Sequence, residues 1–119
     1  MWFLALLFVL LGFLYLFMGL ISPKGKFLGL SYRAMPGVNT PTTNASLGAW
    51  QAAHRKVAPF HTMIGIGLLL ACVYIFVGHP EQSFLLLVLA GAVIAEVPII
   101  VLANEAAERY NVTSSPAGR

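Results

Sequence analysis

The chain has 119 residues, of which 59% are hydrophobic and 9% are charged, whereas about a quarter of the residues in a soluble domain are charged. A chain of this length holds one domain at most, and its composition excludes a soluble protein and predicts an integral membrane protein. The formal net charge of +3 does not indicate a nucleic-acid partner, because the basic residues flank apolar segments, where lipid headgroups attract them. The single cysteine, Cys72, excludes an intrachain disulfide and is expected to pack among apolar neighbours.

Residues 2–21 are apolar throughout, and about twenty helical residues cover the roughly 30 Å of a bilayer core. A secretory signal begins with basic residues and ends at a cleavage site of small residues, and this segment shows neither feature. We therefore interpret it as a retained first transmembrane helix, which Ser22 and Pro23 bring to an end.

The long polar interval, residues 22–57, is expected to connect the first and second spans on the cytoplasmic side. Prolines and glycines argue against a long helix in its first half: Pro23, Gly25, Gly29, Pro36, Gly37 and Pro41. A second helix is predicted to begin near Asn44 or Ser46, because either side chain can cap a first helical turn. The residues that follow are too polar for the bilayer centre, which predicts an interfacial loop and an interfacial start of this helix.

Two further apolar runs, residues 58–77 and 83–103, are predicted to be the second and third transmembrane helices. Pro59 is expected to kink the second helix. The turn between the runs is so short that the two spans form an antiparallel hairpin, and residues 104–119 are expected to be a C-terminal tail.

The predicted fold is therefore an all-α integral membrane protein, a single membrane domain over residues 1–119 with three transmembrane helices. All basic residues fall on one side of it: Lys24, Lys26, Arg33, Arg55, Lys56, Arg109 and Arg119. Loops rich in lysine and arginine stay in the cytoplasm, so we expect a cytoplasmic C-terminus and an N-terminus outside.

A motif in the connector, GVNTPTTNASLGAWQAAHR, runs from Gly37 to Arg55. It resembles the SdpI/YhfL family of small bacterial membrane proteins, in which a G-x-R-T-P-x-T stretch is followed, eleven residues after its arginine position, by W-x-x-x-H-R. The matching residues are Gly37, Thr40, Pro41, Thr43, Trp50, His54 and Arg55, with no gap. Asn39 stands where the family usually has arginine.

The resemblance implies a multi-pass protein of the bacterial cell membrane. The best-known member of the family is an immunity protein that protects a toxin producer and relays toxin binding to a cytoplasmic repressor, and it is longer, with additional spans. We therefore expect a non-catalytic interaction protein, either an SdpI-like immunity or signalling protein or an accessory subunit of a larger membrane complex.

The same motif also allows a purely structural interpretation, because the side chains of Thr40, Thr42, Thr43 and Asn44 can bond neighbouring backbone amides and shape a loop that runs into a capped helix. Trp50, His54 and His61 share one helix face, but histidines seven positions apart lie about 10 Å apart along the axis, too far to hold one ion. We expect no metal and no cofactor. Since no nucleophile with its base and no phosphate-binding loop is present in the sequence, we do not expect an enzyme.

Glu96 is predicted to lie inside the third span, on the side nearer the cytoplasmic edge of the membrane. His61 is predicted to lie just inside the same edge, on the second span. An ionisable residue at this depth is energetically unfavourable and usually faces protein. Two interpretations stay open: the side chains hold the helices together, or they serve proton transfer or ligand binding. The second defines an alternative function, a small transporter or proton-conducting unit that uses Glu96 and His61.

Two pairs of small residues, Gly67 with Ala71 and Gly91 with Ala95, are expected to let the second and third helices pack closely. Three helices still leave much apolar surface facing outward. We therefore expect the lipid bilayer as one partner and, in addition, either further copies of the chain or a larger integral membrane complex.

Overall fold

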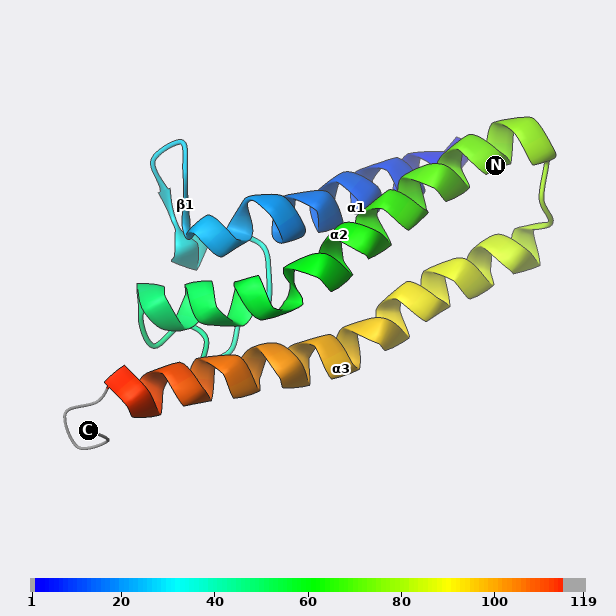
Figure 1. Ribbon diagram of the computed structural model, residues 1–119. Helices are drawn as coiled ribbons and strands as arrows, with labels where there is room; N and C mark the ends of the chain where they lie inside the picture. Colours follow the sequence, from blue (N-terminus) through cyan, green and yellow to red (C-terminus); the bar gives the residue numbers. More distant parts are fainter. Residues whose placement is uncertain (1, 115–119) are drawn as a thin grey trace.

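The computed structural model describes residues 2–114 and consists of three long helices joined by a compact connector and a tight turn (Figure 1). Helix α1 is Trp2–Leu20, α2 is Leu47–Gly78 and α3 is Gln82–Ser114. Each helix is long and apolar enough to cross a membrane, because about twenty residues cover a bilayer core. The predicted all-α membrane fold with three spans is confirmed.

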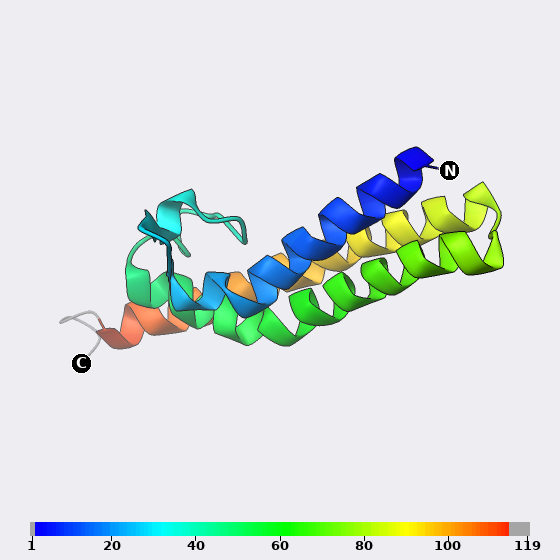
Figure 2. The same ribbon diagram turned by 90° about the horizontal axis from the view of Figure 1, so that it is seen from above.

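Helix α2 is the element on which the others pack. Both α1 and α3 run antiparallel to it and contact it, and the connector gathers at the end where α1 stops and α2 begins (Figures 1 and 2). This arrangement places the polar part of the chain at one end of the molecule.

The connector folds back on itself instead of running as a plain loop. Its elements, in order, are η1 Ser22–Lys24, β1 Lys26–Phe27, β2 Leu30–Ser31 and η2 Tyr32–Ala34. The strands pair antiparallel around Leu28 and Gly29, whose φ angles of 46° and 82° are both positive, as a two-residue hairpin turn requires. The sequence predicted only an irregular loop here, because strands this short leave no readable alternation of apolar and polar residues.

Helix α2 begins and ends as predicted. Ser46 caps its start, since the Ser46 Oγ accepts a hydrogen bond from the backbone N–H of Ala49 at 3.1 Å. His79 follows the last residue in the left-handed conformation, with φ of 48°, which stops a helix. Pro59 lies inside α2, and the ribbon changes direction between the first turns of α2 and the remainder (Figure 1), as a proline kink requires.

Helices α2 and α3 are much longer than a bilayer core. Their 32 and 33 residues extend about 48 and 50 Å, against roughly 30 Å of hydrocarbon. Helix α1 ends near the membrane edge, where a Cβ added to Gly19 would meet the backbones of Ala58 and Thr62. The first turns of α2, residues 47–57, and the last turns of α3, residues 100–114, therefore project beyond the hydrocarbon, and we call this part the overhang.

The expected tail of residues 104–119 is wrong over residues 104–114, which continue α3 as a helix. The cause is packing: Ala103 and Ala107 are fully buried against α2, and burial of an apolar face stabilises a helix more than local propensity does. The rest of that segment, including Arg119, lies outside the described residues, as does Met1.

Glycines bring α1 and α2 into close contact. A Cβ added to Gly65 would meet the Leu16 nitrogen at 2.8 Å and the Gly12 oxygen at 2.9 Å, so a larger residue would push the helices apart. Farther from the connector, the three helices share one apolar cluster: Leu4, Ala5, Phe8, Leu68, Cys72, Ile75 and Leu85. Cys72 thus packs among apolar neighbours, as predicted.

The glycines predicted to pack α2 against α3 do not do so. Nothing lies within 4 Å of a Cβ added at Gly67 or Gly91, so both glycines face away from the rest of the chain. Besides the shared apolar cluster, the two helices pack at and next to the overhang, together with the connector, through other small and branched residues: Val38, Ala49, Ala53, Val57, Ile99, Ala103 and Ala107. Small residues spaced by four occur on several faces of these helices, so spacing alone did not select the face that packs.

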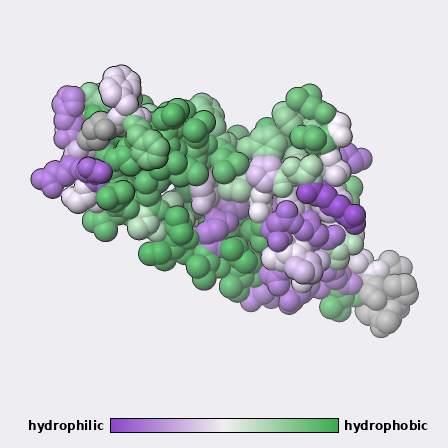
Figure 3. All heavy atoms as spheres, turned by 180° about the vertical axis from the view of Figure 1, so that it is seen from behind, coloured by the Kyte–Doolittle hydropathy of each residue, from purple (hydrophilic) through white to green (hydrophobic). Residues whose placement is uncertain are grey.

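Apolar side chains cover most of the middle of the molecule, and hydrophilic ones gather toward its two ends (Figure 3). Only 11% of the apolar window of α3 is buried, against 39% of that of α1. Helix α3 therefore offers the largest apolar surface to lipid or to a partner.

Candidate functional site

Four motif residues meet at the overhang, where the connector crosses the first turns of α2. Gly37 and Thr43 come from the connector, and Trp50 and His54 stand one turn apart on α2. The side chains of Thr43, Trp50 and His54 are fully buried. We call this cluster the connector clamp, and its residues are Ser22, Gly37, Val38, Thr43, Trp50 and His54.

Trp50 fastens the start of the connector. Its indole N–H donates to the carbonyl of Ser22 at 2.7 Å, and the Ser22 hydroxyl donates to the carbonyl of Pro36 at 2.7 Å. Because Ser22 is fully buried in the folded chain, water cannot take the place of a missing partner there, so each of these hydrogen bonds stabilises the fold. Sequence reasoning missed Ser22 as a site residue, because both of its partners lie far along the chain.

His54 holds the middle of the connector. Its Nε2 accepts a hydrogen bond from the backbone N–H of Val38 at 2.9 Å, and its Nδ1 lies 2.8 Å from the carbonyl oxygen of Trp50. A backbone amide only donates and a carbonyl only accepts, so the ring is neutral and its proton sits on Nδ1. The ring also stacks on Trp50, with centroids 3.8 Å apart and planes inclined by 25°.

Gly37 is required because the connector backbone passes directly against the His54 ring. A Cβ added at Gly37 would overlap the ring at Nε2, and the φ angle of Gly37 is +156°, where a side chain is unfavourable. The glycine and the histidine of the motif are thus two sides of one contact.

Thr43 closes the turn that follows. Its hydroxyl donates to the Val38 carbonyl at 2.8 Å and accepts from the Thr40 N–H at 2.9 Å, while the Thr43 N–H donates to the Thr40 hydroxyl oxygen at 3.1 Å. The side-chain amide of Asn44 donates to the side-chain oxygen of Asn39, so Asn39 also contacts this turn. The predicted bonding to neighbouring backbone amides is confirmed for Thr40 and Thr43, whereas the Asn44 side chain bonds that of Asn39 and no such bond is observed for Thr42 within the described residues.

Helix α3 holds the connector from a second side. The Thr40 hydroxyl donates to the Asn104 side-chain oxygen at 2.7 Å, and the Asn111 side-chain amide donates to the Thr42 carbonyl at 3.2 Å. Sequence reasoning missed both asparagines, because it assigned them to a tail. Their spacing of seven was the available signal, since it places them on one helix face.

Two motif residues stand outside the clamp. Pro41 is exposed on the loop, and Arg55 is exposed on α2. No carboxylate among residues 2–114 forms an ion pair with Arg55. Within the described residues, its guanidinium therefore does not hold the fold through an ion pair.

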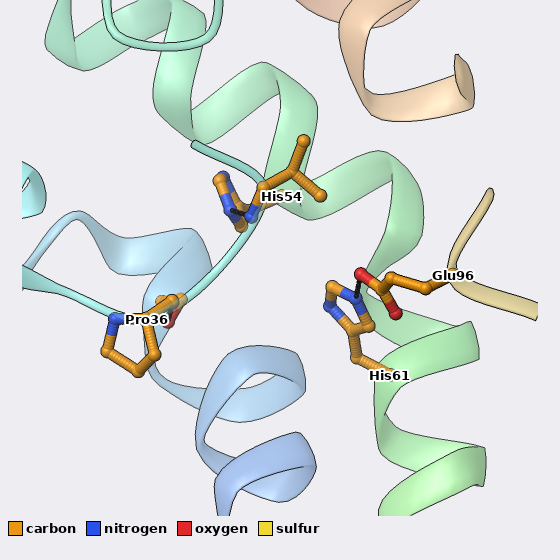
Figure 4. Close-up of polar contacts among 6 residues, drawn as sticks. Pro36, His54, His61 and Glu96 are labelled. Atoms are coloured by element: carbon orange, nitrogen blue, oxygen red, sulfur yellow. Dashed lines mark hydrogen bonds and ion pairs between the residues drawn. The ribbon is translucent and has the colours of Figure 1, made fainter. Parts of the chain in front are cut away.

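A second polar site lies two turns farther along α2, inside the span (Figure 4). His61 Nε2 lies 3.1 Å from Glu96 Oε1 and joins α2 to α3, and the Tyr15 ring of α1 packs edge-on against His61 at 5.7 Å. The meeting of His61 and Glu96 that the sequence allowed is therefore observed. Within residues 2–114, His61 Nδ1 and Glu96 Oε2 are buried atoms without a hydrogen-bond partner.

The geometry of these sites is that of a structural clamp and a helix-joining pair. The polar side chains of the clamp bond mainly to backbone groups, and both nitrogens of His54 are occupied. Among residues 2–114, no group of three or more His, Cys, Asp or Glu side chains is placed to hold a metal ion.

Comparison with known proteins gives no relative: no family model, no curated protein and no solved structure matches the chain.

Proposed function

We propose that the protein is a non-catalytic interaction protein of the membrane, either an SdpI-like immunity or signalling protein or an accessory subunit of a larger membrane complex. The observation that carries the proposal is the state of Glu96. Its side chain is still 24% exposed inside a span, although its Oε1 lies 3.1 Å from His61 Nε2. An acidic side chain inside a span is energetically unfavourable where it meets lipid, so a second protein that covers the exposed part of Glu96 would be favoured.

Two further features support this function. The outer surface of α3 is the largest uncovered apolar face, so a partner that reaches Glu96 also finds room to pack. The clamp gives the polar connector a fixed shape on the overhang, and Arg55 stays exposed beside it. A fixed polar surface with an exposed guanidinium favours binding of a partner over catalysis. The resemblance of the motif to the SdpI/YhfL family points in the same direction.

We further propose that the overhang is cytoplasmic, that the N-terminus is outside and that the membrane is the bacterial cell membrane. The connector and the inner end of α3 lie at the same end of the molecule (Figure 2), so the basic residues of both fall on one side. A reporter that is active only outside, fused after Arg119, should be inactive, and an active fusion would contradict this orientation.

Site-specific photo-crosslinking in native membranes tests the interaction. A photoreactive residue replaces Val93 on α3, which is 69% exposed, and a control replaces Leu10 on α1, which is 60% exposed. The proposal predicts a discrete protein adduct from position 93 and a much weaker one from position 10. Lipid adducts alone at both positions would contradict it.

The alternative function, a small transporter or proton-conducting unit, is favoured by one observation: His61 and Glu96 form a buried ionisable pair in which one atom of each is unpartnered. Reconstitution of the pure chain in liposomes separates the two functions. Proton flux that Glu96→Gln abolishes would establish the alternative, whereas liposomes as tight as empty ones favour the interaction protein.

A further inference from the structure

A groove runs along the seam between α2 and α3. Its apolar part is a hollow of about 250 Å³, lined by Phe60 and Met63 of α2 and by Ala95, Pro98 and Leu102 of α3, among other apolar residues. The lining residues recur every three or four positions, so they lie on the facing sides of the two helices. They are apolar because both helices are long apolar segments.

The groove continues toward the overhang and changes character there. A second hollow of about 260 Å³ shares Leu102 with the first and is lined by Lys56 of α2 and by Glu105 and Arg109 of α3. Lys56 stands one turn before Phe60, and Arg109 two turns beyond Leu102. Since the helices are antiparallel, both cations lie at the same end.

The change of character coincides with the membrane edge. Helix α1 ends beside Ala58 and Thr62, so most of the apolar hollow lies on the hydrocarbon side of the membrane edge, its Leu102 end reaches the overhang, and Lys56 lies at headgroup level. Lys56 and Arg109 are exposed. Neither has a carboxylate within ion-pairing distance in the described part of the chain, although Glu105 lines the same hollow.

We propose that this groove binds one anionic phospholipid, with an acyl chain in the apolar hollow and the phosphate between Lys56 and Arg109. A guanidinium matches two phosphate oxygens at once, and basic pockets between transmembrane helices take anionic headgroups. The apolar hollow provides room but little selectivity, because an acyl chain is equally apolar in the bilayer. Selection among lipids therefore comes from the two cations.

Native mass spectrometry of the full chain in mild detergent tests the site. Phosphatidylglycerol and phosphatidylcholine with identical acyl chains are titrated separately, and one phosphatidylglycerol per chain is expected to bind more tightly than phosphatidylcholine. Each basic residue contributes about fivefold, which corresponds to about 1 kcal/mol, so Lys56→Gln with Arg109→Gln should weaken binding of phosphatidylglycerol about 25-fold. The charge-matched control, Lys24→Gln with Lys26→Gln, changes two exposed lysines away from the groove and should shift it less than twofold.

A second variant tests the apolar part without changing charge. Ala95→Phe fills the apolar hollow and should weaken binding of phosphatidylglycerol, whereas Leu87→Phe, at an exposed position of α3 outside the groove, should not. Trp50 fluorescence checks that each variant is folded. Equal affinity for both lipids, equal loss in the lysine control, or displacement of the lipid by inorganic phosphate at the same site would overturn the proposal.

Discussion

Replacement of Thr43 by valine tests the connector clamp with almost no change of shape. Valine keeps the volume and branching of threonine but removes the hydroxyl. That hydroxyl donates to the Val38 carbonyl and accepts from the Thr40 N–H, and Thr43 is fully buried. The variant therefore leaves one buried acceptor, the Val38 carbonyl, and one half-buried donor, the Thr40 N–H, without a partner.

The size of the effect follows from these two orphaned groups. Loss of its partner costs the buried Val38 carbonyl about 1–3 kcal/mol and the half-buried Thr40 N–H about 1 kcal/mol, so opening of the connector should become easier by about 2–4 kcal/mol in total. Every 1.4 kcal/mol is a factor of about ten in an equilibrium. The open population should therefore rise roughly thirty- to thousandfold.

Hydrogen exchange in detergent micelles measures this population directly, because an amide in the clamp exchanges only when the connector opens. In Thr43→Val, the Val38 and Thr40 amides should exchange faster by the factor above, while amides in the middle of α2 keep their protection. Thr43→Ser retains the hydroxyl and serves as the control, with a change below about fivefold. Equal exchange in the valine and serine variants would refute the role assigned to the hydroxyl, and equal acceleration along α2 would refute the clamp as a local unit.

Two more predictions concern single contacts. Gly37→Ala should lower the free energy of clamp opening by about 3 kcal/mol, because the added Cβ displaces His54 from the Val38 amide and also strains the backbone. Gly29→Ala is the control, because Gly29 has a positive φ but no neighbour within 4 Å of an added Cβ. This control should lower the free energy by only about 1 kcal/mol. Hydrogen exchange of the connector amides measures both, and equal effects would contradict the contact. Glu96→Leu should lower the free energy of unfolding by about 2 kcal/mol, because buried His61 loses its partner. Glu96→Gln keeps an acceptor, so its free energy of unfolding should stay within about 1 kcal/mol of the wild-type value. A denaturing-detergent titration measures both. A leucine variant as stable as the wild type would show that the pair does not hold the helices together.

The three spans were predictable because apolar length is a local property of the sequence, and the start of α2 was predictable because Ser46 acts on its own first turn. The length of α3 was not, because residues 104–114 are helical through burial of Ala103 and Ala107 against α2, a tertiary effect that a polar tail sequence does not reveal.

The candidate site divides in the same way. The threonine turn involves residues three to five positions apart and could be predicted, whereas the bonds of Ser22 to Trp50 and of Thr40 to Asn104 join residues 28 and 64 positions apart and required the fold. The sequence placed His61 and Glu96 at a similar depth but gave no helix rotation, so their contact became known only from the structure. Because the rotation of each helix about its axis could not be predicted, Gly67 and Gly91 were wrongly predicted to pack α2 against α3.

Purification of the protein from its native membranes in mild detergent, with the mass of the intact complex measured, tests the central claim most directly. The account predicts a stoichiometric assembly in which a different membrane protein contacts α3, and loss of that partner when Val93 and Val97 on the exposed face of α3 are replaced by tryptophan. A pure chain or homo-oligomer that conducts protons in liposomes and carries no other protein would contradict it.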